Sequence, residues 1–191
     1  MPWPDGYGPV ASSKRGAAIT VRKIVVRSLS ARSTVGRLQC GNLVLRCALG
    51  RSGIRSQKRE GDGATPRGQH RFESAFFRRD KTARPRTALS LTATRRNDGW
   101  CDAAKDRNYN RRISHPYPAS AEHLWRSDSL YDVVVVMDYN RRPRRRGAGS
   151  AIFMHVAAQG LKPTEGCVAL SRRDLLKVLA RIGPRTRIVI V

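Results

Sequence analysis

The sequence predicts a single, mainly β domain. Roughly six segments are rich in β-branched and apolar residues, only one segment has clear helical periodicity, and strands and helices do not alternate along the chain. The length of 191 residues suits one domain, and 40% of the residues are apolar. A chain of this size and composition can bury a core without disulfides or a structural metal.

The first predicted strands form a meander near the N-terminus. Residues 19–27 (ITVRKIVVR) are β-branched and partly alternating, and residues 34–39 and 43–49 follow with a Cys-Gly-Asn turn between them. Residues 1–17 contain Pro, Gly and Ser with little apolar patterning. We therefore expect a flexible tail at 1–17, followed by the folded domain at 18–191.

Long loops are predicted in the middle of the chain. Residues 50–71 contain five glycines, one proline and almost no apolar side chains. Residues 78–99 are charged and irregular, and residues 100–120 are rich in aromatic and polar side chains. Loops this long in a compact domain are usually functional or disordered, and the aromatic residues of 100–120 argue against disorder.

The strongest predicted strand is Tyr131 to Tyr139, whose continuous run of valines predicts burial on both faces. A basic loop follows at 141–146, and Ala151 to Val156 forms a further strand. Residues 157–170 predict a loop that leads into a short apolar segment. The chain closes with a predicted strand at 185–191.

One helix is predicted, and it begins at Ser171. Ser171 and Asp174 have the spacing of a capping box, in which the side chain of each residue bonds the backbone N–H of the other. Gly183 and Pro184 are placed to end the helix. The apolar face consists of Leu175, Leu176, Val178, Leu179 and Ile182.

Charge and cysteine usage limit the classes of function. The 38 Lys and Arg against 14 Asp and Glu give a net charge of +24, so the protein should associate with polyanions such as nucleic acid, anionic wall polymers or lipid head groups. The four cysteines form no CxxC pair and have no histidine at zinc-finger spacing, so no metal is expected. No apolar run is long enough to predict a transmembrane segment.

Cys167 and His155 are the candidate catalytic pair. Cys167 follows Gly166 at the end of a loop, so the backbone N–H groups of both residues could hold an oxyanion. His155 ends an apolar strand twelve residues earlier and could act as the base, and the positive N-terminal end of the helix at Ser171 could favour a thiolate. The spacing alone leaves open a buried structural cysteine beside an unrelated histidine.

Two segments of the chain resemble the L,D-transpeptidase (YkuD-type) catalytic domain. That family places a histidine upstream of a Ser/Thr-x-Gly-Cys element, as in His155 followed by residues 164–167 (TEGC). Residues 58–68 (KREGDGATPRG) are similar to its K-x-x-G-D-x-x-T-P-x-G segment. Residues 100–102, 108–110 and 131–132 are similar to a subgroup of small bacterial members. The resemblance runs from about residue 19 to residue 191.

Three positions depart from the family pattern. Val156 stands where the family commonly has Gly, Glu165 where it commonly has His, and Ala169 where it often has Arg. These changes touch the acceptor side and the binding of the substrate carboxylate. They leave Cys167 and His155 in their roles.

The resemblance implies an L,D-transpeptidase-like β-sandwich with a helix after the active-site cysteine. It implies a cysteine-dependent L,D-transpeptidase that acts on peptidoglycan stem peptides through a thioester, with no cofactor and no metal. The implied catalytic residues are Cys167 and His155, with Gly166 and Cys167 as the oxyanion hole. Substrate contacts are expected at Thr164, Glu165 and Tyr139.

Other functions stay open at this point. The same site is an L,D-carboxypeptidase if water resolves the thioester, and an inactive member of the fold could bind the wall without chemistry. The charge alone also fits a non-enzymatic protein that binds nucleic acid or another polyanion. We expect a monomer.

The location of the protein is also open. The resemblance implies the cell envelope or periplasm, whereas the N-terminus lacks the apolar core of a secretory signal, which taken alone predicts a cytoplasmic protein. The basic loop at 141–146 is either a solvated run of charge or a grip on the carboxylates of wall peptides.

Overall fold

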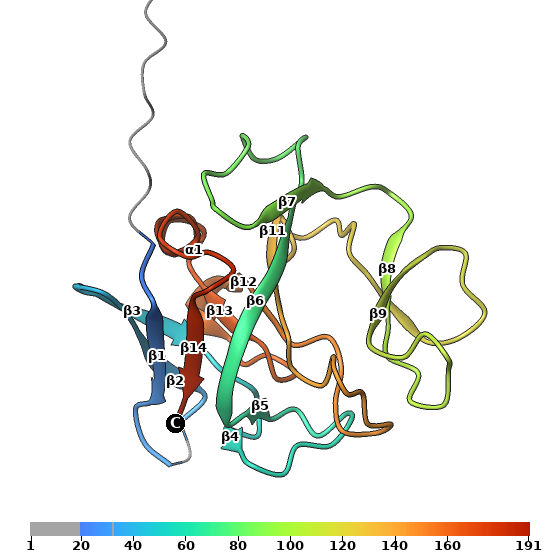
Figure 1. The fold of residues 1–191 in the computed structure, drawn as a ribbon, viewed down its shortest axis with the longest axis horizontal. Coiled ribbons are helices and arrows are strands. Elements are labelled where there is room, and N and C mark those ends of the chain that lie inside the picture. Colours follow the sequence, from blue (N-terminus) through green and yellow to red (C-terminus); the bar gives the residue numbers. More distant parts are fainter. Residues whose placement is uncertain (1–19, 32) are drawn as a thin grey trace, which may run out of the picture.

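Nine strands pair into one sheet that closes on itself (Figure 1). The computed structural model describes residues 20–31 and 33–191, so the predicted tail at 1–17 lies outside the described residues. The strand order is β11-β12-β13-β3-β2-β1-β14-β6-β7, and β11 also pairs with β6. The strands are β1 (Lys23–Ser28), β2 (Val35–Cys40), β3 (Leu43–Ala48), β6 (Gly68–Phe77), β7 (Ser90–Ala93), β11 (Val133–Met137), β12 (Phe153–Val156), β13 (Val168–Leu170) and β14 (Arg187–Ile190).

The main core lies inside this circuit of strands. All five residues of β11 are buried, as the valine run predicts, because Val133, Val135 and Met137 pack into this core while the alternate Val134 and Val136 pack into a second apolar cluster on the other face. Alternate residues of β1, Ile24 and Val26, point into the same core together with Ile188 and Ile190 of β14. The predicted mainly β sandwich is confirmed, with the two layers joined through shared strand pairing.

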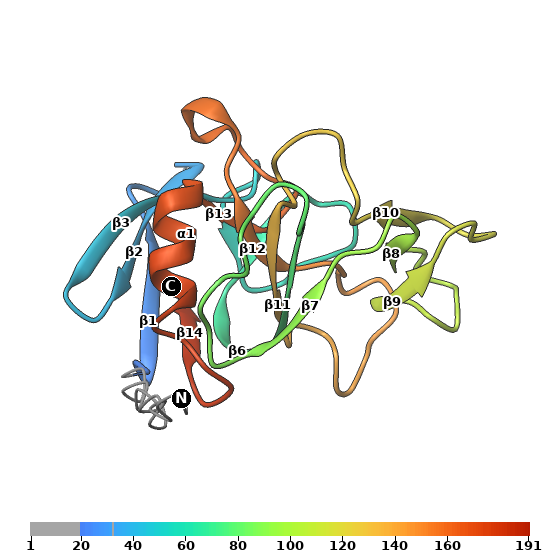
Figure 2. The same ribbon diagram turned by 90° about the horizontal axis from the view of Figure 1, so that it is seen from above.

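The helix α1 (Arg172–Leu179) follows β13 directly and covers the core (Figure 2). The Ser171 hydroxyl accepts a hydrogen bond from the Asp174 N–H at 3.1 Å, which confirms Ser171 as the N-cap, while the Asp174 carboxylate accepts from the Ser171 hydroxyl at 2.9 Å and not from its backbone N–H. The helix ends at Leu179, earlier than Gly183 predicts, because the Arg181 N–H bonds to the Val178 carbonyl and tightens the last turn. Among the described residues, no helix is long and apolar enough to cross a membrane.

The predicted N-terminal meander is confirmed. Strands β1, β2 and β3 pair in antiparallel order, and Gly41 occupies the turn between β2 and β3 with a φ of +60°. The final strand β14 pairs in parallel with β1, so the first and last strands of the domain lie side by side and the chain leaves β14 at the opposite end from where it enters β1 (Figure 1). Ile19, the first residue of the predicted strand, lies outside the described residues.

The predicted loops are partly wrong. Within 50–71, β4 (Ile54–Arg55) pairs with β5 (Thr65–Pro66), and β6 already begins at Gly68. The segments 78–99 and 100–120 contain β7, β8 (Asp98–Cys101) and β9 (Arg111–Ser114). These strands are four residues each and mix polar with apolar side chains, even in β8, which is buried throughout, so they lack the apolar alternation that predicts a strand.

A small second sheet has the order β10-β8-β9, with β10 at Ala121–His123. Figures 1 and 2 place β8 and β9 on the opposite side of the molecule from β2 and β3. Trp100 of β8 is buried and packs edge-on against Phe153 of β12, with ring centroids 5.1 Å apart. The small sheet is thereby attached to the strand that carries His155.

Candidate active site

His155 lies on β12, and Cys167 directly precedes β13, the parallel strand that pairs with β12. In the pairing of β12 with β13, Met154 lies opposite Val168, so Cys167 enters the sheet beside Phe153. The Phe153 N–H donates to the Cys167 Sγ at 3.3 Å, and the Sγ donates to the Ala151 carbonyl at 3.3 Å. His155 lies two residues further along β12, on the same face as Phe153.

Both side chains line one cavity of about 460 Å³. Two of the predicted substrate contacts, Thr164 and Glu165, line it as well. The Tyr139 hydroxyl instead donates to the Ala148 carbonyl at 2.6 Å, and Tyr139 does not belong to the described lining of this cavity. The structure therefore brings four of the predicted site residues to the cavity and places Tyr139 outside it.

Burial keeps both candidate catalytic groups neutral. It raises the pKa of the Cys167 thiol to about 12, and the nearby Glu122 charge adds to the rise, against the Phe153 N–H and the Lys58 charge. Burial also lowers the pKa of His155 to about 4. The expected preformed thiolate is therefore not what this geometry favours: at neutral pH the site holds a thiol and an uncharged imidazole.

The imidazole of His155 is held in one orientation. Its Nδ1 lies 2.9 Å from the Val156 carbonyl, so Nδ1 carries the proton and Nε2 keeps the free lone pair of a base. The Tyr131 ring packs edge-on against the imidazole at a centroid distance of 5.2 Å. Among the described residues, no hydrogen bond joins His155 to Cys167. Such catalytic bonds often tighten only when substrate is bound.

The turn before Cys167 is built by Thr164 and Gly166. The Thr164 hydroxyl donates to the Cys167 carbonyl at 2.7 Å and accepts from the Gly166 N–H at 3.2 Å. Gly166 has a φ of +129°, and a Cβ there would lie 2.6 Å from the Ala64 carbonyl oxygen, so only glycine fits. Of the two predicted oxyanion donors, the Gly166 N–H is thus already directed at Thr164.

The segment 58–68 packs under this turn. The Lys58 Nζ lies 2.7 Å from the Asp62 Oδ1, and the Lys58 side chain is 2% exposed. Burial alone would raise the pKa of Asp62, but bonds from the Arg59 N–H and from Lys58 lower it. A Cβ on Gly166 would lie 3.3 Å from the Lys58 Nζ, so the buried ion pair supports the turn that presents Cys167.

The residues around 100–110 brace the far wall of the cavity. The Asn110 side-chain oxygen accepts from the Trp100 Nε1–H at 3.0 Å and from the Ala151 N–H at 3.1 Å. Tyr109 accepts from the Gly149 N–H at 3.0 Å and donates to Glu60, which lines the cavity. These contacts explain why the aromatic and polar residues of this region are ordered.

Sequence reasoning missed Glu122 of β10. Its Oε2 accepts from the Tyr131 hydroxyl at 2.6 Å, and it lines the cavity with Cys167. Nothing in the sequence marks it, because β10 is three residues long and lies in a polar stretch. Glu165 lies at the exposed mouth, where its carboxylate pairs with the Arg51 Nε at 2.9 Å.

No cluster of three or more metal-ligating side chains lies within the part of the chain that the structure describes. The four cysteines are free and buried. The site is therefore defined by one cysteine, one histidine and the carboxylates around them, in a cavity at the edge of a mainly β domain. This arrangement is of the class that can carry out acyl transfer through a cysteine.

The chain belongs to the family of the YkuD L,D-transpeptidase catalytic domain, whose model matches residues 22–190. This confirms the resemblance seen in the sequence. A search of curated proteins gives no match.

Solved structures of L,D-transpeptidases from Mycobacterium tuberculosis are similar to the chain. One from strain H37Rv is 13% identical with a TM-score of 0.41, and the match covers 88% of this chain and 57% of the chain in that structure. L,D-transpeptidase 3 is 14% identical with a TM-score of 0.40, and the match covers 88% of this chain and 60% of the chain in that structure. The chain thus spans less than two thirds of either solved structure.

Proposed function

We propose that this protein is a cysteine-dependent L,D-transpeptidase that acts on peptidoglycan stem peptides. The observation that carries the proposal is that Cys167 and His155 line one cavity in a chain of this family. The catalytic domain occupies residues 18–191, acts as a monomer in the cell envelope, and needs no cofactor.

The first half-reaction forms a thioester. The Cys167 sulfur attacks the carbonyl carbon of the third residue of a tetrapeptide stem, and the His155 Nε2 takes the thiol proton. Because both groups are neutral at rest, proton transfer accompanies the attack. When the tetrahedral intermediate collapses, the bond to D-Ala breaks and His155 returns the proton to the leaving amine.

The oxyanion of that intermediate is held by the backbone. The Cys167 N–H is the primary donor, and the Gly166 N–H joins it by turning from the Thr164 hydroxyl, a bond of 3.2 Å at rest. Each such donor typically lowers the barrier by roughly 3 kcal/mol. In the second half-reaction an amine of another stem attacks the thioester, which makes the crosslink and frees the thiol.

The test is mass spectrometry of disaccharide-tetrapeptide muropeptides incubated with the purified protein. Loss of D-Ala with formation of dimers is the expected result, and Cys167→Ala should abolish both. Cys101→Ala is the matched control, since Cys101 is also a buried free cysteine but lies in β8.

Each other outcome has a definite meaning. Loss of D-Ala without dimers would establish an L,D-carboxypeptidase on the same site. If folded, reduced protein yields neither product, the proposed function is wrong, and the protein is better described as a binder of polyanions.

A further inference from the structure

The wall of the cavity has the opposite charge to the rest of the molecule. The whole chain carries 38 basic and 14 acidic residues. Four of those acidic residues line the cavity, against two basic ones. The acidic residues are Glu60, Asp102, Glu122 and Glu165, and the basic ones are Arg126 and Lys162.

The two basic residues offset only part of this negative charge. Arg126 is held by a two-pronged ion pair with Asp128, with a shortest N–O distance of 2.6 Å. Lys162 lines the cavity but is exposed, so its charge is screened by solvent. The inner carboxylates therefore face the cavity with an excess of negative charge.

Three of these carboxylates converge from separate segments. Glu122 lies on β10, Asp102 follows β8, and Glu60 belongs to the segment under the cysteine turn. Burial raises the pKa of Glu122, and the charges of Asp102 and Glu60 raise it further, against the Tyr131 hydrogen bond and the Arg126 charge. Three carboxylates that line one cavity repel one another, so a cation between them is favoured.

Two polar atoms at this wall lack a partner among the described residues. Ser150 is 6% exposed and lines the cavity, and its Oγ makes no hydrogen bond to any of them. The buried Oδ1 of Asp102 is likewise without a donor from that part of the chain. Glu122 and Glu60 accept only from the neutral hydroxyls of Tyr131 and Tyr109. A buried polar group left without a partner is costly, so the wall is suited to a ligand with several donors.

We propose that Asp102, Glu122 and Ser150 form a subsite for the ammonium group of the acyl acceptor. An ammonium group carries a positive charge and three N–H donors, which matches two carboxylates and one hydroxyl. Glu60 adds negative charge at the edge of this subsite. The proposal rests on the proposed function, since it names the charge class of the second substrate of the same site.

The acceptor nitrogen loses two protons as it attacks the thioester. The ammonium gives one proton to a carboxylate of the subsite, and its nitrogen then attacks the thioester carbonyl. The new C–N bond forms as the C–S bond breaks. The second proton passes from the nitrogen through His155 to the Cys167 sulfur. The carboxylate releases its proton to solvent, and the free enzyme is restored.

The test compares two nucleophiles on one preformed thioester. Ethylamine is a cation at neutral pH and hydroxylamine is uncharged, so only ethylamine needs the subsite. Glu122→Gln and Asp102→Asn should each lower the yield of ethylamide relative to hydrolysis about 10- to 100-fold, as expected for a lost charge-assisted hydrogen bond. The ratio of hydroxamate to hydrolysis should change less than about twofold.

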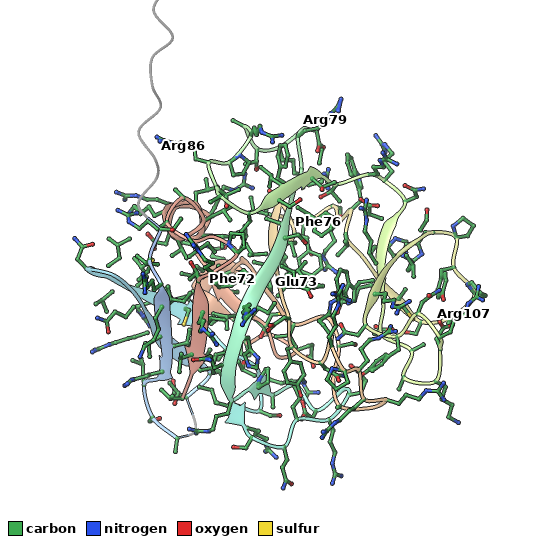
Figure 3. All side chains as sticks on the ribbon, in the orientation of Figure 1. Phe72, Glu73, Phe76, Arg79, Arg86 and Arg107 are labelled. Carbon is green, nitrogen blue, oxygen red and sulfur yellow. The ribbon has the colours of Figure 1, made fainter. Side chains whose placement is uncertain are left out.

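Glu73→Gln is the matched control. Glu73 is a carboxylate on β6 that pairs with Arg141 outside the cavity, and Figure 3 shows it in the middle of that strand. Its substitution should leave both ratios unchanged. If the cavity variants resemble this control toward ethylamine, the subsite is wrong while the proposed function stands.

If no thioester forms, the proposed function fails and binding alone decides the subsite. Saturation-transfer NMR with ethylammonium chloride should show saturable binding to the wild-type protein and to Glu73→Gln. The signal should be lost in the Glu122→Gln and Asp102→Asn variants. Absence of saturable binding to the wild-type protein would overturn the subsite.

Discussion

The acidic cavity and the arginine-rich loop at 141–146 lie close together but have opposite charge. Arg144 donates to the Tyr109 carbonyl at 2.7 Å, while the hydroxyl of the same tyrosine donates to Glu60 at the cavity. The net charge of +24 therefore describes the exterior and not the site. Overall charge therefore predicts what the surface attracts, whereas the charge of the cavity wall predicts which substrate group the site selects.

The loop crowds like charges together. Arg111, Arg141, Arg142 and Arg144 line a surface hollow with Pro143. Burial lowers the pKa of Arg144, and the charges of Arg111 and Arg141 lower it further. Other arginines point outward over the surface, as Arg79, Arg86 and Arg107 do in Figure 3. This exterior should hold the protein on an anionic polymer, with the cavity free to select a cation.

The largest effect should come from the base in the cavity. His155→Gln removes the group that takes the thiol proton, and because burial holds the Cys167 pKa near 12, few thiols would ionise unaided. We expect thioester formation to slow about 10²- to 10⁴-fold, measured by mass spectrometry of samples quenched at successive times. An unchanged rate in a folded variant would show that another group is the base.

Acid sensitivity should also come from the cavity. His155 has a pKa of about 4 in the folded protein against 6.5 as its ordinary value, so below pH 6.5 the unfolded chain binds a proton that the folded one does not. Stability should fall as pH decreases from about 6.5 to about 4, by about 3 kcal/mol in total. Urea unfolding across that range measures it, and His155→Gln should flatten the slope. Equal slopes in both proteins would contradict the assigned pKa.

A smaller loss of stability and of rate should come from breaking the ion pair between Lys58 and Asp62 under the cysteine turn. Lys58→Met leaves the carboxylate of Asp62 without its cation, so we expect a loss of about 1 to 3 kcal/mol in stability and roughly tenfold slower thioester formation. Lys177→Met is a control, since Lys177 pairs with Asp174 on the exposed face of α1. If Lys58→Met behaves like this control in both assays, the support role of Lys58 is wrong.

The smallest effect should come from the exterior. Arg142→Gln with Arg144→Gln removes two charges from the loop and should weaken binding to isolated cell-wall sacculi a few-fold at low salt. A sedimentation assay over a range of salt concentrations measures this. The rate of thioester formation on a small tetrapeptide should stay within about twofold. A large loss of that rate would mean that the loop belongs to the site.

Part of the fold and of the candidate site could be predicted from the sequence. The valine run of β11 and the Ser171 cap of α1 follow from local patterns. The pairing of Cys167 with His155 needed the family resemblance as well, because their spacing alone left a structural cysteine open. The family resemblance also singled out the segment 58–68 without assigning it to the site, and the structure shows that it packs under the cysteine turn.

The acidic wall could not be predicted. Glu122 and Asp102 come from short strands without periodicity, and only the pairing of β10 with β8 brings them together. The site pKa values also depend on three-dimensional burial, which is why a thiolate was expected and a neutral thiol is favoured. Tyr139 continues the strong β11 segment, but its hydroxyl bonds to the Ala148 carbonyl beside the loop and not to the site.

The intact mass of the protein after brief exposure to a disaccharide-tetrapeptide donor tests whether Cys167 forms the thioester. We expect a mass increase equal to the donor without its D-Ala, located on Cys167 by peptide mapping and absent from Cys167→Ala. We also expect an amine to remove the adduct. No adduct on folded, reduced protein, or an adduct on Cys40, Cys47 or Cys101 in its place, would contradict this role of Cys167.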